Sequence, residues 1–237
     1  SILHIEGERN ADTNLINEAA SSLQLASKLL EKHKYPLAWG ILQNRLGLIF
    51  YNQGLEKGEP NLLRDSISYF KSALQIYTQQ KMPARWVEIM SNFAHAVQVF
   101  GEHTQSLEAL ATSVNAFNAI LESRNRKKTP LAWAATQNNL GSALFLLSKR
   151  TRSINRLRSA RTAFKLCLEV YKEQGKETLT SVISKNLKRT SNLLTHLEWE
   201  NSITDEIPKD PSGLPEPGEG LIKKSTYRKS LPLRLAG

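Results

Sequence analysis

The chain of 237 residues has a single cysteine, Cys167, and this scarcity excludes a fold held together by internal disulfides. It favours a reducing compartment, and we expect a cytoplasmic protein. Long apolar runs are also missing, so we expect no membrane span. The opening residues "SILHIEGERN" lack both an initiator methionine and the basic-then-apolar layout of a secretory signal, which predicts a piece of a longer protein.

Sequence motifs for catalysis and metal binding are scarce as well. There is no glycine-rich phosphate loop, no paired-cysteine motif and no nucleophile elbow. None of the five histidines has a second histidine four positions on, which excludes the paired-histidine zinc motif. We therefore expect no enzymatic activity, no metal and no cofactor.

What the sequence does contain is an internal repeat with a period of 47 residues. Each copy carries a proline, a tryptophan, an apolar residue, a small residue and a phenylalanine at fixed positions. In that order they are Pro36, Pro83 and Pro130; Trp39, Trp86 and Trp133; Leu46, Phe93 and Leu140; Gly47, Ala94 and Gly141; Phe70, Phe117 and Phe164. Proline suits the first turn of a helix, and apolar residues recur at helical spacing in the second half of each copy. Each copy is therefore predicted to be a helical hairpin, and such hairpins stack into a solenoid.

The register of the repeat predicts the borders of the segments. We expect a partial repeat with one helix in 1–35, three repeats in 36–82, 83–129 and 130–176, a polar-faced capping helix in 177–200, and a tail rich in proline and glycine in 201–237. The fold class is all-α, with stacked antiparallel hairpins and an extended C-terminal tail. The tail is predicted either to dock in extended form, on its own chain or a neighbour, or to be a linker, and both alternatives stay open.

The order of tryptophan, Leu-Gly, small residue and aromatic residue resembles the tetratricopeptide repeat (TPR) family. The third copy carries the pattern best, with Trp133, Leu140, Gly141, Ala160, Phe164 and Tyr171. The usual TPR period is 34 residues, so these units look like a variant with longer helices. The resemblance covers residues 36–176. It implies a right-handed α-solenoid whose first helices line a concave groove for a peptide or protein, and it names no ligand.

The repeated tryptophans and Cys167 are expected to have structural roles. Trp39, Trp86 and Trp133 are predicted to fill the space between hairpins, and Cys167 to be a small core residue.

Uncharged polar residues mark the candidate binding face on the first helices. The residues predicted to contact a partner are Gln43, Asn44, Ser91, Gln98, Asn138 and Ser142. Amide side chains both donate and accept hydrogen bonds, so they suit the backbone of an extended peptide. The alternative is that such residues join neighbouring helices, as Asn139 could.

Positive charge gathers in one part of the chain. Residues 122–200 hold 16 Lys and Arg against 6 Asp and Glu, a difference of +10 that equals the net charge of the whole chain. The candidate basic patch consists of Lys149, Arg150, Arg152, Arg156, Arg158, Arg161 and Lys165. A localised patch attracts acidic partners, although a solvated surface would look the same in sequence.

These observations predict a scaffold or assembly subunit that binds a protein or peptide partner, which could be acidic. The competing hypothesis is a regulatory repeat domain of a larger signalling enzyme. A nucleic-acid binder is the least favoured, because few aromatic residues accompany the Arg and Lys residues. An oligomer or larger complex is compatible with the repeats.

Overall fold

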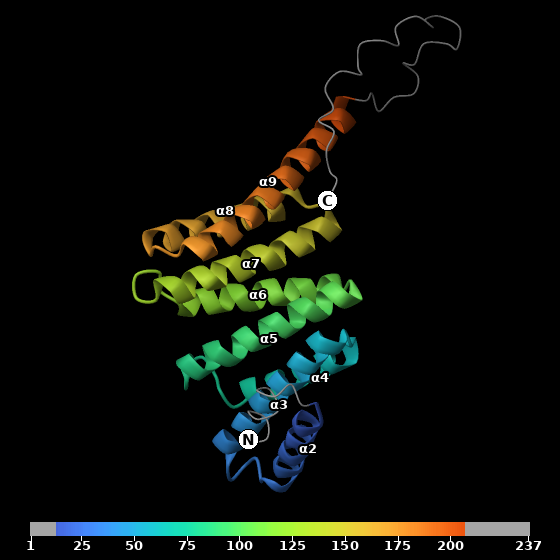
Figure 1. The fold of residues 1–237 in the computed structure, drawn as a ribbon, viewed down its shortest axis with the longest axis vertical. Coiled ribbons are helices and arrows are strands. Elements are labelled where there is room, and N and C mark those ends of the chain that lie inside the picture. Colours follow the sequence, from blue (N-terminus) through green and yellow to red (C-terminus); the bar gives the residue numbers. More distant parts are fainter. Residues whose placement is uncertain (1–12, 207–237) are drawn as a thin grey trace, which may run out of the picture. The chain divides into compact units, whose positions relative to one another are not determined.

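A computed structural model describes residues 13–206, and this part of the chain contains eight helices and no strand (Figure 1). They are α2 (Thr13–Leu29), α3 (Pro36–Lys57), α4 (Pro60–Leu74), α5 (Pro83–Thr104), α6 (Leu107–Ser123), α7 (Pro130–Thr151), α8 (Ile154–Glu173) and α9 (Glu177–Glu206). The all-α prediction is confirmed for these residues. The packing described below is that of residues up to Leu197, which form one compact unit.

The helix boundaries follow the 47-residue period at every step. The first helices of the hairpins, α3, α5, α7 and α9, begin at Pro36, Pro83, Pro130 and Glu177, each 47 residues after the one before. The second helices, α2, α4, α6 and α8, begin at Thr13, Pro60, Leu107 and Ile154 with the same spacing. The three predicted hairpins are present, and the helix expected in 1–35 is α2.

The border predicted between capping helix and tail is wrong by six residues, because α9 continues from 200 to Glu206. Neither proline nor glycine occurs between 201 and 206, so nothing in this segment opposes a helix. A proline disfavours helical backbone at the residue before it, and the first proline after 200 is Pro208. The remainder of the predicted tail, 207–237, lies outside the described residues.

Small residues set the distance between the two helices of a hairpin. A Cβ atom on Gly47 would lie 2.6 Å from the ring of Phe70, and one on Gly141 would lie 2.9 Å from the ring of Phe164. Both rings are almost completely buried. The glycines therefore let each phenylalanine pack directly against the backbone of the first helix.

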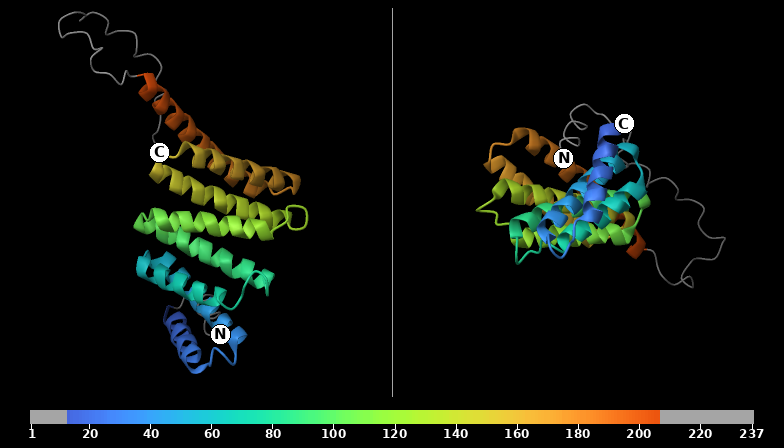
Figure 2. Two further views of the ribbon diagram at one scale, coloured as in Figure 1. Left: turned by 180° about the vertical axis from the view of Figure 1, so that it is seen from behind. Right: turned by 90° about the horizontal axis from the view of Figure 1, so that it is seen from below.

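The hairpins themselves pack in series, as the left view of Figure 2 shows. Helix α4 packs on α5, α6 packs on α7, and α2 packs on α3. First helices also meet directly, since α3 contacts α5. Residues from consecutive hairpins thus share one apolar core, which includes Phe70, Phe117 and Leu157.

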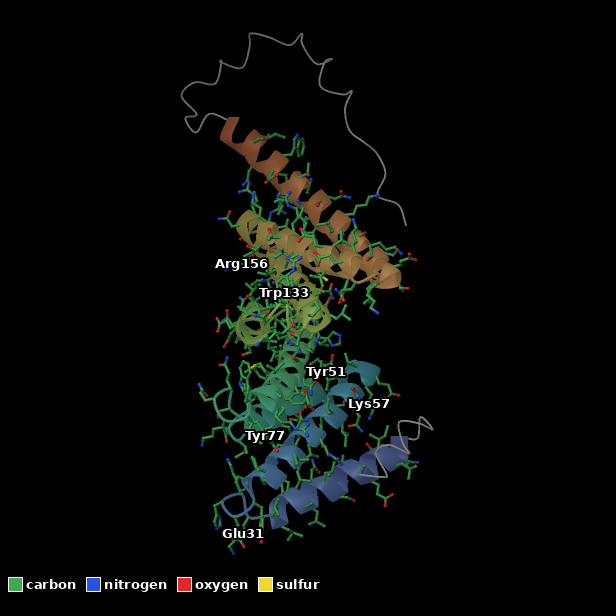
Figure 3. All side chains as sticks on the ribbon, turned by 90° about the vertical axis from the view of Figure 1, so that its left-hand side faces the viewer. Glu31, Tyr51, Lys57, Tyr77, Trp133 and Arg156 are labelled. Atoms are coloured by element: carbon green, nitrogen blue, oxygen red, sulfur yellow. The ribbon has the colours of Figure 1, made fainter. Side chains whose placement is uncertain are left out.

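The tryptophans differ in burial. Trp86 is 7% exposed, which confirms the structural role expected for it. Trp39 and Trp133 are half-buried, and each lies under a cation, with Lys32 Nζ 4.5 Å and Arg126 Cζ 5.5 Å from the ring centroids. Trp133 contributes to the core between hairpins (Figure 3). Each of these two rings therefore packs partly in the protein interior and partly against a cationic side chain.

Side chains also join the connections between consecutive hairpins. Lys32 Nζ donates to Gln75 Oε1 over 2.9 Å, and the guanidinium of Arg126 donates to Glu173 Oε1 over 3.0 Å. Gln79, which occupies the same repeat position, donates to Ser123 Oγ over 2.7 Å. The repeat position of Lys32, Gln79 and Arg126 therefore supplies a side-chain hydrogen bond between neighbouring repeats in all three cases.

Helix α9 begins like a first helix but presents a polar surface where the others present small residues. Ser181, Lys188 and Thr195 stand one period after Ala134, Gly141 and Ser148, and all three are exposed. Its apolar residues Ile183 and Leu194 are buried against the preceding helices. The predicted polar-faced capping helix is thus present.

Candidate partner-binding face

The first helices carry two hollows between them, and both contain predicted partner-binding residues. A hollow of ≈ 290 Å³ between α3 and α5 is lined by Asn44, Arg45, Tyr77 and Glu88, among others. A second, of ≈ 200 Å³, is lined by residues of α5, α7, α8 and α9, namely Gln98, Glu102, Ser142, Phe145, Leu146, Phe164, Asn186 and Arg189. We call the surface that holds both hollows the first-helix face. Asn44, Gln98 and Ser142 therefore lie on it.

A row of asparagines crosses this face from one helix to the next. Asn92, Asn139 and Asn186 are one period apart, and Asn44 lies beside them on α3. Asn92 Nδ2 donates to Asn44 Oδ1 over 3.5 Å, and Asn139 Nδ2 lies 3.1 Å from His95 Nε2. The alternative role weighed for Asn139, a bond between helices, is the one it has.

Two predicted residues hold acceptor atoms that are buried without a partner. Gln98 Oε1 and Asn138 Oδ1 make no hydrogen bond within the described residues. The amide nitrogen of Asn138 donates to Asn139 Oδ1 over 3.4 Å, and Ser142 Oγ donates to the Asn138 carbonyl over 3.0 Å. A buried acceptor without a donor costs about 1–3 kcal/mol. Each of these two oxygens therefore carries an unmet need for a donor within the part of the chain that the structure describes.

Gln43 belongs to the packing rather than to an open surface, which corrects its place among the predicted binding residues. Its side chain is buried, and its Nε2 donates to Ser27 Oγ of α2 over 2.6 Å. Ser91 is half-buried and its hydroxyl donates to the Val87 carbonyl of its own helix over 2.7 Å. Of the six predicted residues, Asn44, Gln98, Asn138 and Ser142 remain candidates for contacting a partner.

His95 lies at the centre of the asparagine row and is held in its neutral form. Burial lowers its pKa below the ordinary 6.5, and its ring packs edge-on against Phe117 with centroids 5.3 Å apart. Because the Asn139 amide nitrogen can only donate, His95 Nε2 must accept and carry no proton. Protonation would place two donors against each other.

We expect this histidine to make the fold sensitive to mild acid. With its pKa lowered on folding, the unfolded chain binds the extra proton first as the pH falls through the ordinary value of 6.5, so the free energy of unfolding decreases. Urea denaturation at about pH 7.5 and about pH 5.5 should show this loss in the wild type and a smaller loss in His95→Gln. The exposed His103→Gln is the matched control and should behave like the wild type. Equal acid sensitivity in all three proteins would contradict the expectation.

The seven residues of the basic patch lie together at the end of α7, in the α7–α8 connection and on α8. All are exposed except Arg161, which is half-buried, and Figure 3 marks the position of Arg156. Arg152 ends α7 in a left-handed conformation with φ 52°. Since α8 is a helix, Arg158, Arg161 and Lys165 share one side of it, as predicted.

Cys167 is a core residue, and its thiol is not activated as a nucleophile. It is fully buried, and burial raises the pKa of its thiol to about 11 despite hydrogen bonds with Tyr171 and the Asn138 backbone. A thiol is reactive only as the thiolate. The expectation of a small packed residue is confirmed.

Sequence reasoning missed the three other polar or charged residues of the second hollow, Glu102, Asn186 and Arg189. Asn186 and Arg189 follow Asn139 and Ser142 by one period, so extending the register into α9 could have found both. Arg189 stacks over Phe145 with its Cζ 4.8 Å from the ring centroid. The capping helix therefore contributes to the first-helix face as well as closing the core.

Neither a metal site nor a membrane span emerges from the described part of the chain. Between 13 and 206, His, Cys, Asp and Glu side chains form no group of three that could hold a metal ion. Over the same range, no helix combines the length and apolar character needed to cross a bilayer.

Comparisons with known proteins give only a distant likeness. No protein-family model matches the chain, and no curated protein matches it. Among solved structures, one titled "DHF58 filament" is similar at 16% sequence identity, with 73% of this chain and 88% of that chain covered and a TM-score of 0.39.

Proposed function

We propose that the chain is a protein-interaction module of the TPR type, a right-handed α-solenoid that binds an extended segment of a partner protein on its first-helix face. The 47-residue period, with its tryptophan, glycine and phenylalanine positions, supports the assignment to long TPR-like repeats. We further propose that the module is a cytoplasmic scaffold or assembly subunit without catalytic activity.

The observation that carries this proposal is the pair of buried acceptors, Gln98 Oε1 and Asn138 Oδ1. An extended peptide offers a backbone N–H group at every residue other than proline. Once the Gln98 and Asn138 side chains turn outward, such a donor would satisfy their oxygens without requiring a particular side chain of the partner. Asn44, Asn92 and Asn139 add further carboxamides on the first helices. The partner is recognised first through its main chain.

Replacing the two acceptors with apolar residues of similar size separates a binding role from a structural one. We expect Gln98→Met and Asn138→Leu to leave the free energy of unfolding unchanged or raised, because an unsatisfied buried oxygen is removed. The same variants should weaken binding of peptides selected from a displayed random library by about tenfold, the loss of one or two hydrogen bonds. Ser91→Ala, which removes only a hydroxyl bonded to its own helix, is the control.

The proposal requires weaker peptide binding without any loss in the free energy of unfolding. Destabilisation of Asn138→Leu by several kcal/mol with unchanged peptide affinity would assign these residues to the packing. A library that yields no peptide for the wild-type chain would remove the main-chain recognition altogether.

A further inference from the structure

A third hollow lies between the second helices α6 and α8 and is also lined by residues of α7. Its volume is ≈ 460 Å³. We call it the α6–α8 groove, and it is lined by Asn118 of α6, by Gln137, Leu140 and Leu144 of α7, and by Arg158, Ser159, Thr162, Ala163 and Leu166 of α8. Of these residues, Arg158 belongs to the predicted basic patch.

The floor and the rims of this groove differ in chemistry. Leu140 and Leu144 form an apolar floor, and Leu166 adds apolar surface from the α8 side. The α6 rim is neutral at Asn118, whereas the α8 rim is basic. Arg158 lines the groove itself, and Lys165 follows it two turns later on the same side of α8.

Five of the seven cations of the basic patch have no carboxylate partner among residues 13–206. These five are Lys149, Arg150, Arg156, Arg161 and Lys165. The nearby carboxylate of Glu169 lies 3.7 Å from Arg126, which balances its charge. The groove therefore joins an apolar floor to an excess of cations on one rim.

We propose that the α6–α8 groove binds an acidic amphipathic helix of a partner protein. A helix lays an apolar stripe onto such a floor and turns its flanking side chains to the rims. Acidic side chains on one flank would meet Arg158 and Lys165, while the other flank meets the neutral α6 rim. An added β-strand is disfavoured, because the walls are helices whose backbone groups are already paired.

The chemistry of the groove also favours this partner over nucleic acid. Its lining contains no aromatic residue for base stacking. An apolar floor gains nothing from a phosphate backbone, which binds through charge alone. The proposal is independent of peptide binding on the first-helix face, since the two surfaces share none of their lining residues.

The test uses the full chain and a synthetic probe of stated composition. The probe is a fluorescein-labelled peptide of about five helical turns, with leucines on one stripe and glutamates flanking it. A scrambled peptide of the same composition, without the stripe, is the peptide control. Fluorescence anisotropy gives the dissociation constants near physiological salt.

Two groove variants address the two parts of the site. Thr162 is exposed, so Thr162→Tyr fills the groove without entering the core. The double variant Arg158→Gln/Lys165→Gln removes the basic rim. We expect each to raise the dissociation constant of the striped probe by about tenfold or more. The matched double variant Lys172→Gln/Lys176→Gln removes the same charge from exposed positions outside the groove lining and should change it less than about twofold.

Three results would overturn the proposal. Equal weakening by both double variants would mean that only long-range charge is at work. Equal affinity for the striped and scrambled peptides would mean that the groove recognises no helix. An RNA oligomer that binds Thr162→Tyr as well as wild type, with no binding of the striped probe, would assign the basic patch to nucleic acid. Thermal unfolding of each variant confirms that a lost signal is not a lost fold.

Discussion

Replacing Phe117 with alanine should lower the free energy of unfolding by about 3–5 kcal/mol, because a completely buried aromatic ring leaves a cavity. The ring is 1% exposed in the core shared by consecutive hairpins, and it also supports the His95 ring above it. Chemical denaturation followed by circular dichroism measures the loss. Since Phe117 belongs to the middle of three hairpins, the cavity also weakens the coupling between the outer two.

Trp133→Ala provides the comparison for this prediction. Its ring is half-buried and lies partly under Arg126, so less apolar surface returns to water when it is removed. The tryptophan is larger, yet its loss should cost less than that of Phe117. If Phe117→Ala lost less free energy of unfolding than Trp133→Ala, the burial of Phe117 would not reflect its contribution to stability.

Gly47→Ala should destabilise the fold by about 1–3 kcal/mol, although alanine is the better helix former. The new Cβ atom would lie 2.6 Å from two carbons of the Phe70 ring, which is fully buried and cannot move aside freely. Overpacking therefore outweighs the gain in helix propensity of about 1 kcal/mol. Chemical denaturation of the variant gives the sign directly.

The middle hairpin supplies an internal control for that prediction. Ala94 occupies the same repeat position and is buried without requiring glycine. Ala94→Gly should lose about 1 kcal/mol through helix propensity, plus the packing of one methyl group. A neutral or stabilising Gly47→Ala would mean that the hairpin spacing adjusts more easily than the Phe70 packing indicates.

The sequence predicted the structure correctly where the chemistry of a residue type restricts its local conformation or packing. Proline in the first turn placed the starts of α3, α5 and α7, and Gly47 and Gly141 marked the close approach of Phe70 and Phe164. Cys167 lay on an apolar stripe and is buried. Each of these inferences needs only local geometry or the repeat register.

Prediction from sequence was weaker where the role of a side chain depends on its partner on another helix. Gln43 and Gln98 look alike in sequence, yet Gln43 donates to Ser27 on α2, whereas Gln98 Oε1 has no partner between residues 13 and 206. Composition could not place the end of α9 either, because Asn201–Glu206 borders a proline-rich segment and is nonetheless helical. Pairings between separate helices decide such cases, and a repeat register alone does not fix them.

The polar surface of α9 has a consequence for how a protein of this kind can change in length. Lys188 stands where Gly141 receives Phe164 in the preceding hairpin, so a further second helix laid on α9 would press its aromatic ring onto a lysine. Copying a whole 47-residue unit between existing hairpins meets no such obstacle, because Gly47, Ala94 and Gly141 occupy that position there. Gene duplication can therefore lengthen the array more readily from within than by adding a second helix onto α9.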